Sequence, residues 1–266
     1  MDETVEQAVQ RAITTMHDRL GEPVTLDDMA KAAMFSKFHF TRVFQRVTGL
    51  SPGRFLSAIR LQRAKQLLVS TDLNVADISF LVGFNSVGTF SSRFSRSVGM
   101  SPSQYRKQGG FATHLPDPAP PESTESAADT SASLVEGVVR AHEERGGPVF
   151  VGLFPGRLPE GAPVRSMLLE RPGHYQLHRV PKGSWYVHAH RLAHDVPNPS
   201  RAVAAVEREP MMVGSKGPIV TGREGNQTVR KVDVLLSSAR IMDPPVLLAV
   251  PDARTLASRL ATRDVG

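Results

Sequence analysis

The sequence contains no cysteine among its 266 residues. This absence excludes disulfide bridges, thiolate zinc sites and cysteine nucleophiles together. Long apolar runs are missing as well, and the first residues, MDETVEQ, are acidic and polar. We therefore expect neither a membrane-spanning helix nor a secretory signal, and we expect a cytoplasmic protein.

Motifs of catalysis are equally scarce. The sequence has no His-Glu-x-x-His helix motif, no phosphate-binding glycine loop and no Gly-x-Ser-x-Gly elbow. We therefore expect no enzymatic activity, no cofactor and no resident metal ion.

What the sequence does contain is an internal repeat. Residues 38–55, FHFTRVFQRVTGLSPGRF, recur as residues 88–105, GTFSSRFSRSVGMSPSQY, at an offset of 50. The segments before them, 25–35 and 74–84, match at an offset of 49, so the second copy has one more residue between its helices. A repeat of this length marks a duplicated supersecondary unit. Each copy is typical of a helix-turn-helix.

Spacing predicts the helices of each copy. Apolar residues at i, i+3, i+4 and i+7 form one stripe along 40–47, with a similar stripe along 90–98. A glycine stands where each of these helices must end. Residues 52–69 predict a long helix that fixes the distance between the two copies, and residues 5–20 predict an amphipathic helix before them.

These residues resemble the AraC family of bacterial transcription regulators. The resemblance covers about residues 5–108 and includes the Phe-x-x-x-Phe cores and the Gly-x-Ser-Pro ends of both copies. It implies seven helices, two helix-turn-helix units joined by one long helix, and sequence-specific binding to double-stranded DNA. It also implies that the second helix of each unit, roughly 37–48 and 87–98, enters a major groove.

Groove-facing residues of the first unit must lie opposite its apolar stripe and near the helix N-terminus. Arg42 can bind guanine with two hydrogen bonds, Gln45 can pair with adenine or phosphate, and Phe38 can contact a thymine methyl. The alternative is that the basic residues are ordinary solvated charges. The candidate DNA-binding residues of this unit are Ser36, Lys37, Phe38, His39, Thr41, Arg42, Gln45 and Arg46.

The second unit is poorer in hydrogen-bond donors. Ser92 occupies the place of Arg42, where the resemblance implies an arginine. We expect the arginines of this unit to contact phosphates and its first residues to read methyl groups or groove shape. Its candidate DNA-binding residues are Ser86, Val87, Gly88, Thr89, Ser92, Arg93 and Arg96.

The turns of the two units differ at one position. Met34 stands where the second copy has Gly83. Because a residue other than glycine is disfavoured at a positive φ, we expect an altered backbone in the first turn.

The net charge is concentrated in the repeat region. Residues 1–110 hold 14 Lys and Arg against 9 Asp and Glu, whereas residues 111–266 hold 18 against 17. A phosphate-binding surface needs such an excess. Because the excess is moderate, we expect limited non-specific affinity for DNA at cellular salt.

The composition divides the chain into an all-α tandem helix-turn-helix domain, 1–110, and an all-β sandwich-like domain, 134–251. Between them, 111–133 is rich in proline and acidic residues, which indicates a disordered linker. The β prediction rests on about seven alternating segments bounded by glycine and proline. These segments are 133–141, 148–155, 173–180, 184–192, 217–222, 228–236 and 245–251. Short helices are expected at 200–207 and within the tail, 252–266.

Residues 173–189 are similar to a hairpin of transthyretin-like and carboxypeptidase-regulatory-like domains. A turn at 181–183 would put the histidines of both strands on one outer face. Such a face could bind a transition metal, act as a pH switch or be plain polar surface. The expected cross-strand pairs are His174 with His190, Gln176 with His188, and His178 with Tyr186.

Three functions remain open. The first is a transcription regulator at the nucleoid that reads two adjacent major-groove segments. Its β domain would bind a small-molecule effector, form a homo-oligomer or contact RNA polymerase. The second is an architectural DNA-binding protein with an oligomerising β domain, and the third is a DNA-tethered, metal-dependent enzyme. The donor-rich first recognition helix favours the first function.

Overall fold

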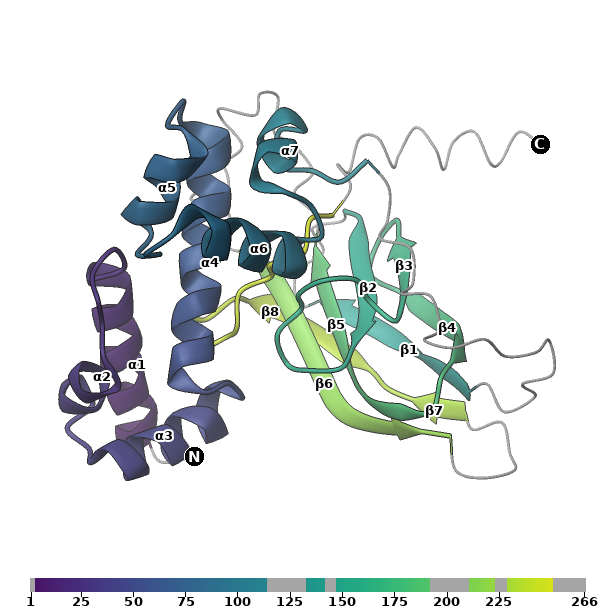
Figure 1. Cartoon of the computed structure of the whole chain (residues 1–266). Coiled ribbons are helices and arrows are strands. Elements are labelled where there is room, and N and C mark those ends of the chain that lie inside the picture. Colours follow the sequence, from purple (N-terminus) through teal and green to yellow (C-terminus); the bar gives the residue numbers. More distant parts are fainter. Residues whose placement is uncertain (1–2, 114–132, 142–146, 192–210, 223–228, 251–266) are drawn as a thin grey trace. The chain divides into compact units, whose positions relative to one another are not determined.

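The computed structural model of this chain describes residues 3–113, 133–141, 147–191, 211–222 and 229–250 (Figure 1). Its contacts divide the chain into two compact units. The first unit comprises 1–110 together with 157–161 and 240–248, and the second unit comprises the rest.

Seven helices form most of the first unit, as the family resemblance implies. The long helix α4 links the trio α1–α3 to the trio α5–α7 (Figure 1). The helix that was expected to enter a groove in each copy begins and ends at the predicted residues. The helices are α1 (Glu3–Asp18), α2 (Leu26–Ala32), α3 (Lys37–Thr48), α4 (Pro52–Ser70), α5 (Val75–Leu81), α6 (Val87–Val98) and α7 (Pro102–Lys107).

Side-chain caps explain where the helices from α2 to α7 begin. At each start, a side-chain oxygen accepts the backbone N–H of the residue three positions later, and each such cap contributes about 1 kcal/mol. Gly49 and Gly99 end α3 and α6 with φ of 78° and 92°, which glycine adopts without strain. The six capping residues are Thr25, Ser36, Ser51, Asn74, Ser86 and Ser101.

Each helix-turn-helix copy is built on a chain of three buried aromatic rings. Successive ring centroids lie 5.3 and 5.4 Å apart in the first copy, and 5.6 Å apart for both pairs in the second. These are tilted or edge-on contacts, the arrangements that aromatic quadrupoles favour. The rings are Phe40, Phe44 and Phe55 in the first copy and Phe90, Phe94 and Tyr105 in the second.

The expectation of an altered first turn is wrong. Met34 has φ of 57° and its counterpart Gly83 has φ of 85°. Both turns close with the same hydrogen bond, from the N–H that follows this residue to the carbonyl five positions earlier, at 3.0 and 2.9 Å. The first turn therefore keeps the backbone path of the second. The backbone strain at Met34 costs about 1–2 kcal/mol. We infer that a different backbone conformation of the turn would cost more, because the packing of the two helices would be lost.

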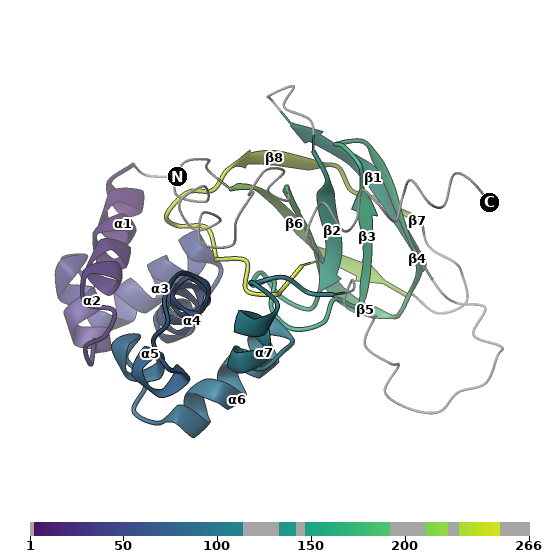
Figure 2. The same ribbon diagram turned by 90° about the horizontal axis from the view of Figure 1, so that it is seen from above.

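The second unit is a single curved sheet. Its strand order is β3-β2-β5-β6-β8-β1-β4, and β7 pairs with β1 off this path. The sheet curls until its edge strands β3 and β4 meet (Figure 2). There, Arg165 Nε donates to the His178 carbonyl at 3.2 Å. The strands are β1 (Ser133–Ala141), β2 (Val149–Phe154), β3 (Arg165–Leu169), β4 (His174–Val180), β5 (Gly183–Arg191), β6 (Met212–Thr221), β7 (Val229–Lys231) and β8 (Val234–Ser238).

The all-β prediction is confirmed for the described part of this unit, whereas two stacked sheets are not confirmed because the strands pair continuously. The strand β3 was not predicted. The predicted strand at 228–236 divides into β7 and β8, which pair with successive parts of β1. The segment 245–251 forms no strand over its described residues, and the linker from 114 and the helices expected after 200 lie outside the described residues.

The predicted hairpin is wrong. Strand β4 pairs with β1, where His174 lies opposite Val138, while β5 lies between β2 and β6. His188 and His190 are only 6% and 3% exposed, because the middle of β5 is covered on both faces. Arg179, the last residue but one of β4, has φ of 54°. The expected outer face of histidines therefore does not exist.

Candidate nucleic-acid interface

Helix α3 presents one exposed face that folding does not use. The Phe38 side chain is 91% exposed, although it is large and apolar. Arg42 and Gln45 lie one and two turns further along the same face and are exposed too. Phe40 and Phe44 on the opposite face are fully buried, which fixes the rotation of α3 about its axis.

Most polar side chains of this face have no competing partner. The side chains of Arg42, Gln45 and Arg46 make no hydrogen bond or ion pair within the described residues. Lys37 Nζ lies 3.0 Å from Asp27 Oδ2, and both side chains are about half exposed. Exposed ion pairs contribute between zero and about 1 kcal/mol, so a phosphate can replace the aspartate at little cost.

Three of the sequence candidates also have local structural roles. The Ser36 hydroxyl accepts the His39 N–H at 3.4 Å as the cap of α3, and Thr41 Oγ1 donates to the Lys37 carbonyl at 2.9 Å. The His39 ring packs edge-on against Phe35, with centroids 4.6 Å apart. The cap was foreseeable, since serine before a helical stripe is a typical N-cap signal.

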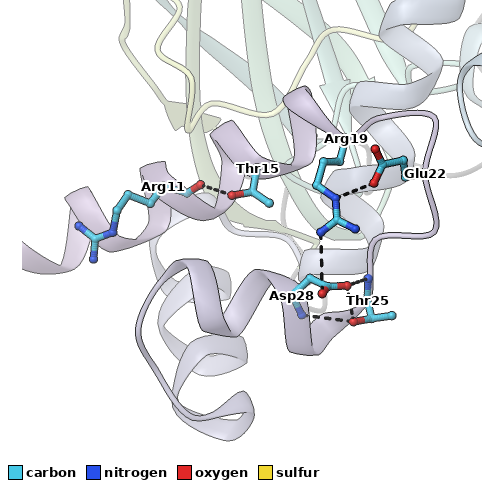
Figure 3. Close-up of polar contacts among 6 residues, drawn as sticks. All are labelled: Arg11, Thr15, Arg19, Glu22, Thr25 and Asp28. Atoms are coloured by element: carbon cyan, nitrogen blue, oxygen red, sulfur yellow. Dashed lines mark hydrogen bonds and ion pairs between the residues drawn. The ribbon is translucent and has the colours of Figure 1, made fainter.

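A cluster of polar contacts connects the start of α2, the helix before α3, with the end of α1 (Figure 3). Thr25 and Asp28 form a reciprocal capping box. Arg19 Nε donates to Glu22 at 2.7 Å, and its Nη1 lies 3.8 Å from Asp28. The hydrogen bonds from Thr25, with Arg19 nearby, hold the pKa of Asp28 below its usual value. This acid therefore stays ionised where the α2 dipole favours negative charge.

Helix α6 presents a smaller and less charged face. Gly88, Thr89, Ser92 and Arg96 are exposed and Val87 is half-buried. A Cβ atom added to Gly88 would meet nothing within 4 Å, so this turn is open to solvent. The Ser86 hydroxyl accepts the Thr89 N–H at 3.2 Å and donates to its hydroxyl at 2.8 Å, so it serves as the cap.

Arg93 lies differently from the other candidates. It takes the place that the buried Val43 has in the first copy, and it is half-buried at the edge of the core. Its Nε atom is buried and finds no hydrogen-bond partner among the described residues. A phosphate contact from Arg93 stays a prediction, and it requires the guanidinium group to reach outward from this position.

The described residues contain no group of three or more histidines and acids that could hold a metal ion. No helix among them is long and apolar enough to cross a membrane. His174, His188 and His190 do not converge, because the strands that carry them have different neighbours.

The helical region is similar to known helix-turn-helix proteins. A family model described as a helix-turn-helix domain matches residues 29–108. The HTH-type transcriptional activator AarP of Providencia stuartii is 32% identical over 98 residues, which are 37% of this chain and 73% of AarP. The chain belongs to the AraC-type family of helix-turn-helix transcription regulators.

Other HTH-type transcriptional regulators match a stretch of similar length. The HTH-type transcriptional regulator YdeC of Bacillus subtilis is 33% identical over 99 residues, which are 37% of this chain and 34% of YdeC. The chain thus spans about a third of the length of such relatives. An AraC-type regulator structure from Chromobacterium violaceum is 29% identical, with a TM-score of 0.38, covering 39% of this chain and 92% of that one.

Proposed function

We propose that this AraC-type chain is a sequence-specific transcription regulator whose α3 and α6 read two adjacent major-groove segments of double-stranded DNA. The exposure of Phe38 supports this most directly. A large aromatic ring that is exposed on a rigid helix is typical of a binding surface, because covering it with a partner stabilises the complex. The unpaired Arg42 and Gln45 on the same face provide the hydrogen-bond donors that base edges require.

The two helices are expected to contribute unequally. The α3 face combines an aromatic ring, a guanidinium group and an amide, so it suits direct base readout. The α6 face has small side chains and Arg96, so it suits phosphate contacts and shape readout. We infer that most of the sequence information lies in the half-site bound by α3.

Selection from random duplexes tests this function. The full-length protein should enrich one bipartite sequence whose halves lie about one helical turn, or ~34 Å, apart. The half-site read by α3 should be the more strongly defined half. Enrichment of no sequence at all would favour an architectural DNA-binding protein instead.

For the second unit we propose a regulatory role without enzymatic activity. An open cavity of about 640 Å³ lies beside β1, β4 and β7 and offers a site for a small-molecule effector. Contacts with RNA polymerase or with a second copy of the chain are the other proposed roles. Because the proposed partner is double-stranded DNA, we also propose that the protein lies at the nucleoid. The charged and polar residues lining the cavity are Glu136, His174, Gln176, Lys231 and Asp233.

A further inference from the structure

Two short segments from the second half of the sequence belong to the helical unit. They are Arg157–Gly161, which we call the strap, and Arg240–Leu248. Leu158, Leu247 and Leu248 are at most 3% exposed, so apolar burial holds both segments in place. The Pro159 carbonyl accepts the N–H groups of Leu247 and Leu248 at 3.1 and 3.3 Å, which joins the two segments.

The strap contacts the C-terminal ends of both recognition helices. At the end of α3, the Arg157 side chain packs directly on Gly49, so that a Cβ added there would overlap it. At the end of α6, the Gly161 N–H donates to the Ser97 carbonyl at 2.7 Å. Five residues therefore extend from one recognition helix to the other.

Glu160 makes the central contacts of the strap. Its Oε1 accepts Arg54 Nη2 at 2.7 Å, and its Oε2 accepts the Ser97 hydroxyl at 2.7 Å. Arg54 lies in the first turn of α4, directly after α3, while Ser97 is buried in the last turn of α6. Hydrogen bonds to an ionised group are roughly twice as strong as neutral ones. One carboxylate thus connects the start of α4, next to the end of α3, with the end of α6, in addition to the chain connection through α4.

A second anchor holds the joined segments against the middle of α4. Lys65 Nζ donates to the carbonyls of Val246 and Leu247 at 3.1 and 2.9 Å. Burial lowers the pKa of Lys65 to about 8, so the ammonium group remains mostly protonated at neutral pH. The strap is therefore fixed at α3, α4 and α6 together.

We propose that Glu160 is a positioning residue that fixes the separation of α3 and α6 and thereby sets which half-site spacing the protein accepts. This inference rests on the proposed function. Inserting one base pair moves a half-site by about 3.4 Å along the duplex and rotates it by roughly a tenth of a turn. A single helix can bend or twist by such an amount, whereas a second connection between the copies resists it.

The test uses full-length protein and the bipartite site that selection returns. Affinity is measured for that site, for versions with one base pair added or removed between the halves, and for the isolated half-site read by α3. Wild-type protein should discriminate strongly against altered spacing. Glu160→Ala should reduce this discrimination about tenfold while half-site affinity stays unchanged. Unchanged half-site binding also shows that the variant is folded.

Three further variants separate positioning from general damage. Ser97→Ala should reproduce the loss of discrimination, since it removes the hydrogen bond that joins Glu160 to the second copy. Alanine is also well suited to a helix. Glu160→Gln should be intermediate, because the amide oxygen still accepts from Ser97. The matched control Glu170→Ala, at an exposed acid of the second unit, should behave as wild type.

Two results would overturn the inference, and they differ in what they imply for the proposed function. If the wild-type protein selects a site and Glu160→Ala keeps the same spacing discrimination, the positioning role is wrong and the proposed function stands. If the wild-type protein selects no site, both fail together.

Discussion

The substitution Gly83→Ala should destabilise the helical unit by about 3 kcal/mol. Gly83 has φ of 85°, a conformation that costs an L-residue about 1–2 kcal/mol. The new Cβ would lie 2.6 Å from the Leu20 carbonyl oxygen and 2.7 Å from Arg60 Nη2. Arg60 donates to the carbonyls of Leu20 and Glu22 at 3.0 and 2.6 Å, and displacing it loses about 1 kcal/mol for each bond.

The first copy provides the matched control. Met34→Ala replaces one L-residue by another at φ of 57° and removes a side chain that is 76% exposed. Its effect should stay within about 0.5 kcal/mol. Urea unfolding followed by far-ultraviolet circular dichroism reports the helices, while fluorescence of the single tryptophan, Trp185, reports the β unit. Equal losses for the two variants would refute the reasoning about the second turn.

Three further predictions follow from single residues. Phe38→Ala should weaken binding to the selected DNA site yet leave the free energy of unfolding within about 0.5 kcal/mol of wild type, because the ring is 91% exposed; a large loss of stability would contradict this. Gly88→Ala should stabilise α6 by about 0.5–1 kcal/mol in chemical denaturation, since its Cβ meets nothing within 4 Å. If α6 enters a groove, the same variant should lose DNA affinity. Burial lowers the pKa of His188 to about 4, so the folded state favours the neutral ring. The contribution of His188 to the free energy of unfolding of the β unit is then fully present above pH ~6.5. It falls by up to about 1.4 kcal/mol per pH unit as the pH drops toward 4. Urea unfolding followed by Trp185 fluorescence at several pH values measures this dependence of stability on pH. If His188→Gln shows the same dependence, groups other than His188 cause it.

The helical unit was predictable from the sequence because its signals are local. The apolar stripe that includes Phe40 and Phe44 fixed the buried face of α3, and Gly49 fixed its end. The same stripe therefore also identified the exposed face that carries Phe38. Local strain at Met34 favours a different backbone, but the packing of the unit holds the turn, and that packing has no local signal in the sequence.

The β unit was less predictable because alternation identifies the faces of a strand and not its neighbours. In β4, Tyr175 and Leu177 alternate with exposed residues and are buried, as such a pattern indicates. Only two residues separate β4 from β5, which favoured a hairpin, yet the two strands pair with other parts of the sheet. The positive φ of Arg179 and the curvature of the sheet have no clear local signal.

The strap was not foreseen for a similar reason. Residues 157–161 have the composition of an ordinary loop, and 245–251 have that of a strand. Their roles depend on partners about a hundred or more residues away, such as Arg54 for Glu160 and Lys65 for Val246. A single sequence carries no signal for such pairings.

The proposed function requires that α3 reads base edges while α6 mainly contacts the phosphates of the DNA backbone. It is tested most directly by measuring the affinities of Arg42→Ala and Arg96→Ala for the selected site and for random duplex at one fixed salt concentration. Arg42→Ala should lose about 1–3 kcal/mol on the selected site and little on random duplex, whereas Arg96→Ala should weaken both alike. Equal losses on both duplexes for both variants would contradict the account.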